Sequence, residues 1–120
     1  MSEVWYHLAQ QTEDENTAAL WMVARDDSGY TCRAWQLSPF DRRKVEAWLR
    51  MVELRRSKGM SLPPPPDISD MSPVEAHFEK IHEARAYLGT TWDPALKWHA
   101  AEFFRQIDPV RYPSARIEEK

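Results

Sequence analysis

Two histidines and two glutamates are the residues of this sequence whose types and spacing could do chemistry. Glu79 and His82 stand three residues apart, and so do His99 and Glu102. Positions three apart on a helix are neighbours on one flank, so each pair could present a carboxylate and an imidazole together. Both groups are metal ligands, and two such pairs on packed helices could converge on one ion.

The segment "EKIH" around the first pair resembles the Glu-x-x-His spacing of di-iron carboxylate bundles. The resemblance implies bridging glutamates on two further helices, and these are not identifiable in the sequence. His77 and His99 also fall at the edges of apolar stripes, where a histidine ordinarily hydrogen-bonds a neighbour. We therefore expect no metal and no cofactor, and keep a metal-dependent enzyme as the second alternative function.

Nucleophilic catalysis finds little support in the composition. Cys32 is the lone cysteine, which excludes an internal disulfide and a cysteine-based zinc site. It falls on the buried face of a predicted strand, where a thiol acts as a small hydrophobe. No serine lies in a glycine-flanked elbow, and three glycines are too few for a phosphate-cradling loop. We expect a protein that is not an enzyme.

The tryptophans indicate binding instead. On a predicted helix, Trp98 projects away from the apolar side and lies on the same side as Arg105. On a predicted hairpin, Trp35 shares a mixed face with Leu20 and Met22. Tryptophan beside arginine is the typical composition of an interface hot spot. The alternative is that Trp98 packs beneath the C-terminal tail or the proline-rich segment.

One stretch of the chain is basic. Residues 39–58 carry seven basic and three acidic side chains, whereas the whole chain holds 16 basic and 19 acidic residues. Arg43 and Arg50 on this predicted helix could assist a protein contact, or could meet phosphates. Glu46 and Glu53 can pair with the arginines along a solvated face. A nucleic-acid-binding regulator that uses residues 42–58 is therefore the first alternative function.

The segment "LPPPPD" resembles the proline ligands of EVH1 domains, in which an aromatic residue, four prolines and acidic residues follow one another. Leucine replaces the aromatic residue here, and Asp67 and Asp70 supply the acids. The residues concerned are Leu62, Pro63, Pro64, Pro65, Pro66 and Asp67. The other interpretation is a stiff polyproline II spacer, roughly 12 Å long over four prolines.

Periodicity and turn residues predict an α+β fold. A hairpin is expected at 19–37, with "DDSG" as its turn, a positive φ at Gly29, and Arg25 opposite Tyr30. Residues 4–9 could add a third strand to this small antiparallel sheet, or could equally start a short helix.

Three helices should follow the sheet, at about 39–57, 73–88 and 94–107. Each begins with a capping residue and a proline, as in "SPFD", "SPVE" and "DPAL". Gly89 would end the second helix.

We expect one domain over residues 1–120, with a proline-rich spacer at 59–71 and an extended tail at 109–120. The first ten residues lack a signal-peptide pattern, and no window is long enough to cross a membrane. The expected function is a non-catalytic protein-interaction or adaptor protein of the cytoplasm. It would bind another protein and no membrane, with self-association allowed. An accessory protein of a phage or mobile element, an inhibitor or assembly chaperone, is one example.

Overall fold

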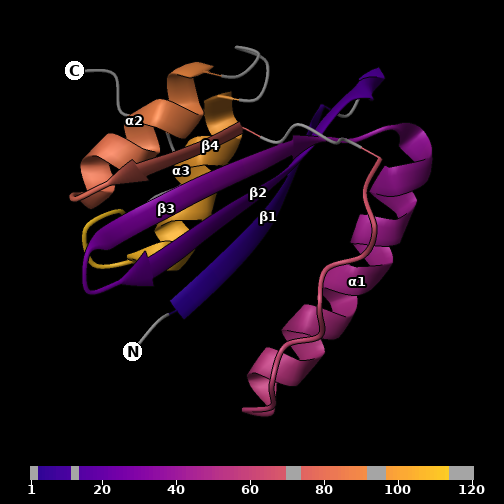
Figure 1. The fold of residues 1–120 in the computed structure, drawn as a ribbon, viewed down its shortest axis with the longest axis horizontal. Coiled ribbons are helices and arrows are strands. Elements are labelled where there is room, and N and C mark those ends of the chain that lie inside the picture. The colour runs from indigo at the N-terminus through magenta and orange to yellow at the C-terminus, as the bar shows by residue number, and fades with distance from the viewer. Residues whose placement is uncertain (1–2, 12–13, 70–73, 92–96, 114–120) are drawn as a thin grey trace.

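The computed structural model describes residues 3–11, 14–69, 74–91 and 97–113. In these residues one antiparallel sheet has the strand order β1-β2-β3-β4 (Figure 1). The strands are β1 Glu3–Gln11, β2 Asp14–Asp26, β3 Gly29–Gln36 and β4 Val74–Phe78. The helices are α1 Pro39–Ser57, α2 Ile81–Thr91 and α3 Lys97–Ile107. The predicted α+β class, the third strand and the first helix are confirmed.

The hairpin between β2 and β3 has the predicted register. Arg25 lies opposite Tyr30 and Val23 lies opposite Cys32. Gly29 ends the turn with a φ of 132°, a conformation that side-chain-bearing residues rarely adopt. The turn therefore fixes which residues of β2 face each side of the sheet.

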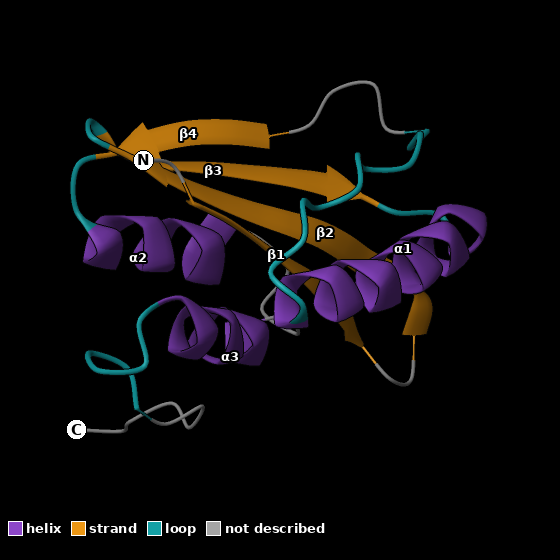
Figure 2. Cartoon of the chain, turned by 90° about the horizontal axis from the view of Figure 1, so that it is seen from below, coloured by secondary structure: helices purple, strands orange, loops and turns teal. Residues whose placement is uncertain are grey.

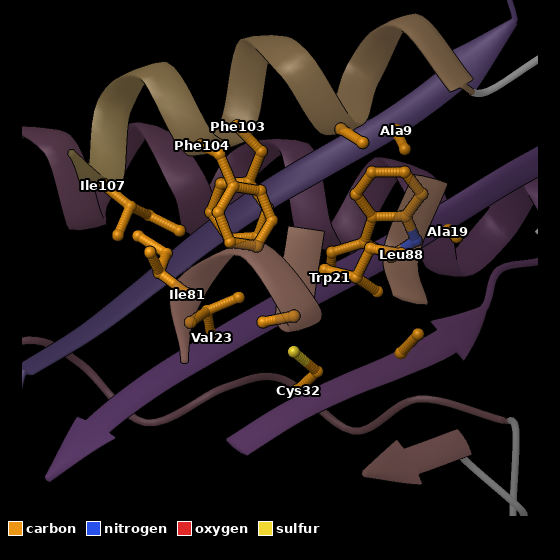
Figure 3. Packing of buried hydrophobic residues seen from close by; sticks show 13 residues of the cluster. Ala9, Ala19, Trp21, Val23, Cys32, Ile81, Leu88, Phe103, Phe104 and Ile107 are labelled. Atoms are coloured by element: carbon orange, nitrogen blue, oxygen red, sulfur yellow. The ribbon is translucent and has the colours of Figure 1, made fainter. Parts of the chain in front are cut away.

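Alternation along β2 builds a hydrophobic cluster on each face of the sheet. Trp21 and Val23 point toward α2 and α3, where they meet Phe103 and Phe104 (Figure 3). Leu20 points the opposite way and packs with α1. We call these the α2–α3 cluster and the α1 cluster. In the view of Figure 2, α1 lies apart from the α2–α3 pair.

The prediction of the second helix is wrong for the first half of its range. Val74–Phe78 is strand β4, which pairs with β3, and α2 begins only at Ile81. Gly89 is not a helix end, because α2 continues to Thr91. The α1 helix is thus inserted between two neighbouring strands instead of following a finished sheet. The start predicted for the third helix lies outside the described residues, and its end at Ile107 is confirmed.

The proline-rich segment runs back along α1 (Figures 1 and 2). Leu62 and Ile68 pack into the α1 cluster, and Trp48 donates its indole N–H to the Pro63 carbonyl at 3.3 Å. Lys44 donates to the Asp67 carbonyl at 2.7 Å. This segment is therefore attached to the helix by side chains along its length.

Asp41 fastens the far end of that segment. Its fully buried carboxylate accepts the Ser69 N–H at 3.0 Å, while Ser38 caps the helix by accepting the Asp41 N–H. Burial alone would raise the pKa of Asp41, but the hydrogen bonds, that from Ser69 first, outweigh it and the pKa is lowered. The charged form is thus stabilised in the folded protein.

We expect Asp41→Ala to lower the free energy of unfolding by about 2 kcal/mol, because a charged hydrogen-bond acceptor is removed from a buried site. Trypsin should then cleave faster after Lys58, at the start of the segment that Asp41 holds. Asp27→Ala, in the exposed hairpin turn, is the control. Equal denaturant midpoints for the two variants would contradict this role of Asp41.

Candidate protein-binding surfaces

The four residues predicted as metal candidates are not brought together. Glu79 precedes α2 and His82 lies in its first turn, both exposed. On α3, Glu102 forms an ion pair with Arg105 at 2.9 Å. Within the described part of the chain, no group of three or more histidine, cysteine, aspartate or glutamate residues could hold a metal ion.

His99 pairs with another histidine, which sequence reasoning did not find. His99 contacts the Gln10 carbonyl through Nε2 and the His7 Nε2 through Nδ1, each at 2.9 Å. A carbonyl only accepts, so Nε2 of neutral His99 carries the proton and its Nδ1 accepts from His7. The pair spans 92 positions of the chain, so no local pattern could predict it.

His7 is held neutral by its surroundings. Its ring stacks on Phe103, with ring centroids 5.3 Å apart, and lies near Trp21. Burial, followed by the neighbouring His99, lowers the pKa of His7 to about 4, against a smaller opposing effect of Glu102. A residue kept uncharged in this way joins β1 to α3 at neutral pH.

Cys32 has the environment of a core residue. It is fully buried, and burial raises the pKa of its thiol to about 12. A thiol with that pKa is not ionised at neutral pH and is a poor nucleophile.

Trp98 lies where helical phase predicts. Its side chain is 49% exposed at the start of α3, while Ala100, Phe103 and Ile107 face the core. Its indole meets the His99 ring edge-on, with centroids 5.2 Å apart. An aromatic residue of this size in solvent is a candidate partner contact.

The residues predicted to form a partner surface with Trp35 on the hairpin are covered to different extents. Leu20 is fully buried beneath α1 in the α1 cluster, so it is not accessible to a partner. Trp35 packs against the same cluster, and Met22 is half-buried. No local pattern indicated that α1 would cover this face, because strand alternation does not say which helix packs against which side of a sheet.

Most basic residues of α1 are engaged within the protein. Arg42 contacts Glu46 and Gln10. Lys44 forms an ion pair with Asp41 and donates a hydrogen bond to the Asp67 carbonyl. Arg55 and Arg56 donate to the carbonyls of Ser61 and Val4. Three basic residues remain, and their side chains form no ion pair or hydrogen bond among the described residues: Arg43, Arg50 and Lys58.

The outward side of α1 carries an apolar stripe. Phe40, Met51 and Leu54 are 66%, 47% and 55% exposed. With exposed Ala47 they recur at intervals of seven, four and three residues, which places them on one side of the helix. We call these four residues the outer stripe. Sequence reasoning missed it because the apolar spacing of the buried side, around Trp48, was sufficient to predict the helix.

The proline motif is partly buried by contacts within the protein itself. Leu62, at the position of the EVH1-type aromatic residue, packs into the α1 cluster. Pro64 and Pro65 are exposed, whereas Pro63 and Pro66 are half-buried. A free EVH1-type ligand would need Leu62 detached from α1.

A pocket of about 320 Å³ lies along β1 between α1 and α3. We call it the β1 groove. Its lining residues are Trp5, Tyr6, His7, Leu8, Leu49, Val52, Glu53, Arg56 and Gln106. No sequence pattern indicated it, because it depends on where two helices are placed beside the edge of the sheet.

Comparisons with protein-family models, with curated proteins and with solved structures gave no match. In the described part of the chain, no helix has the length and apolar character needed to span a membrane.

Proposed function

We propose that this protein is a non-catalytic protein-interaction domain, and that the outer stripe of α1 binds the surface of a partner protein. The observation that supports this most is the combined exposure of Phe40, Met51 and Leu54 on a helix whose opposite side is packed. Exposed apolar patches with a polar rim are typical of protein-binding sites. We place this role in the cytoplasm, where a lone thiol such as Cys32 stays reduced.

Charge favours an acidic partner. Arg43 and Arg50 flank the outer stripe and have no ion-pair partner among the described residues. Carboxylates on a partner would neutralise them, whereas a second copy of this protein would bring the same arginines to the interface. Trp98, on α3, is a separate candidate contact.

The nucleic-acid alternative is less well supported by the contacts of α1. Four of its basic side chains bind groups of the protein itself, which reduces the charge free to meet phosphates. The apolar outer stripe also offers a phosphate backbone no hydrogen bond.

The test is capture of partners from an extract of the source cells with Met51→Ser/Leu54→Ser. We expect recovery of the specific partner to fall at least about tenfold, because two apolar anchors are lost from the contact. Val110→Ser is the control, since Val110 is 91% exposed outside α1. Circular dichroism should show both variants folded.

Three results would overturn the proposal. The first is a partner retained by the stripe variant and lost with Trp98→Ala. The second is self-association that the stripe variant abolishes. The third is DNA or RNA binding that weakens steeply with salt and disappears with Arg43→Glu/Arg50→Glu.

A further inference from the structure

The outer edge of β1 offers backbone groups that the sheet does not use. The Leu37 N–H donates to the Ala18 carbonyl at 3.0 Å, so the backbone of Ala18 is directed away from β1. Ala18 lies opposite Gln10, and hydrogen-bonded and non-hydrogen-bonded pairs alternate along antiparallel strands. The backbone of Gln10 is therefore directed outward. The register is unbroken from Glu3 to Gln10, so Val4, Tyr6 and Leu8 are directed outward as well.

Side chains close the two ends of this edge. Arg56 of α1 donates to the Val4 carbonyl at 2.8 Å, and His99 of α3 bonds the Gln10 carbonyl at 2.9 Å. Between them, no described residue hydrogen-bonds the outward backbone of Tyr6 or Leu8. These two residues line the β1 groove. One N–H and one carbonyl from each remain for a ligand.

The walls of the groove differ in character. Leu49 and Val52 of α1 supply an apolar wall, and Gln106 of α3 supplies a polar group. Glu53 also lines the groove and makes no ion pair with any described residue. The Arg56 guanidinium, in contrast, is held by the Val4 carbonyl. The groove therefore presents one acidic and one basic side chain, and of the two only the Glu53 carboxylate has no hydrogen-bond or ion-pair partner among the described residues, so it can meet a basic group of a ligand.

We propose that the β1 groove binds an extended peptide of another protein, which adds as a strand to β1. Its backbone would pair with Tyr6 and Leu8, the mode of recognition used wherever a peptide joins an open sheet edge. Side chains of a strand alternate between two sides, so one set faces the apolar wall of α1. A lysine or arginine in the peptide would meet Glu53.

The position of Trp98 extends this site. Trp98 lies against His99, and His99 marks the Gln10 end of the edge. A basic residue at that end of the peptide could stack on the exposed indole. From Val4 to Gln10 the edge accommodates about five to seven residues, at roughly 3.4 Å each.

The probe is a displayed library of random octapeptides, selected on the whole protein. We expect enriched peptides to alternate apolar and polar residues and to carry lysine or arginine. Glu53→Lys should weaken their binding about tenfold or more, because attraction becomes repulsion. Glu79→Lys, at another exposed glutamate, which lies beyond β4, is the matched control and should bind as the unaltered protein does.

A backbone change tests strand addition directly. Cys32 allows residues 1–31 to be synthesised and ligated to the remainder, so Leu8 can be replaced by N-methyl-leucine. This removes an outward N–H and leaves the bonds to β2 intact. We expect about tenfold weaker peptide binding than for the unmodified ligated chain, the loss typical of a desolvated hydrogen bond.

Hydrogen exchange supplies the structural readout. Without peptide, the amides of Trp5, His7 and Ala9 should exchange slowly, and those of Tyr6 and Leu8 fast. Enriched peptides should protect the amides of Tyr6 and Leu8 from exchange.

The proposal is overturned if no peptide is enriched, if N-methylation at Leu8 has no effect, or if a second copy occupies the groove in sedimentation and exchange experiments. Met51→Ser/Leu54→Ser should keep peptide binding, so this site and the outer stripe can fail independently.

Discussion

Replacing Gly29 with alanine should lower the free energy of unfolding by about 3 kcal/mol, a combination of backbone strain and overpacking. A Cβ at this position would lie 2.2 Å from the Phe78 carbonyl oxygen and 2.9 Å from the Glu79 Cα. Both contacts are with backbone, which cannot move aside as a side-chain tip can. The φ of 132° adds strain for any residue that has a Cβ.

Gly59→Ala is the matched control for this change. Gly59 also has a positive φ, of 68°, but a Cβ there meets nothing within 4 Å. We expect Gly59→Ala to lower the free energy of unfolding by about 1 kcal/mol, the penalty of the backbone conformation alone. Denaturant unfolding of both variants gives the comparison. Equal losses would mean that β4 does not lie against the end of the hairpin.

Acid should destabilise this protein between pH 6.5 and 4 through the protonation of His7 in the unfolded chain. The pKa of His7 is about 4 in the folded protein and 6.5 in the ordinary, solvent-exposed state. In this interval the unfolded chain binds a proton that the folded protein excludes, so stability falls as the pH falls. At pH 4 the free energy of unfolding is lower by about 2 to 3 kcal/mol for this reason.

His7→Phe should remove most of this pH dependence, since phenylalanine can still stack on Phe103 and takes no proton. Denaturant unfolding at pH 7, 5.5 and 4.5 measures the effect. His82→Gln, at an exposed position on α2, is the control: its free energy of unfolding should change with pH as that of the unaltered protein does. The lowered pKa of Asp41 acts at lower pH, because its stabilising effect is lost only as the pH falls below its ordinary value of 3.8. Parallel pH profiles for His7→Phe and the unaltered protein would contradict this account.

Local sequence was sufficient for β2, β3 and α1. Their signals lie within the elements themselves: the glycine of the turn, the alternation of Trp21 and Val23, and the cap at Ser38. The outward position of Trp98 followed from helical phase in the same way.

Strand β4 was missed because two patterns compete there. Serine, proline and glutamate at 72–75 match a helix start, and Val74, Phe78 and Ile81 have helical spacing. The same residues also alternate, with Glu75 and His77 between apolar neighbours, which is the pattern of a strand. Pairing with β3 decides in favour of the strand, and that contact comes from a distant part of the chain.

The candidate sites were less predictable than the fold. Leu20 was assigned to a partner surface because nothing local indicates that α1 covers it. The His7–His99 pair and the β1 groove both join residues far apart in sequence. Such sites depend on how helices are placed on the sheet, and strand or helix periodicity carries no information on that placement.

The insertion of α1 between β3 and β4 bears on the order in which the chain assembles. Strands β1, β2 and β3 follow one another through short connections, whereas β4 joins only after the long excursion from Leu37 to Pro73 has closed. Closing a longer loop removes more chain entropy, and contacts between distant residues form more slowly. We therefore expect a three-stranded meander to be the folding nucleus, with β4 docking late and opening first when the native state fluctuates.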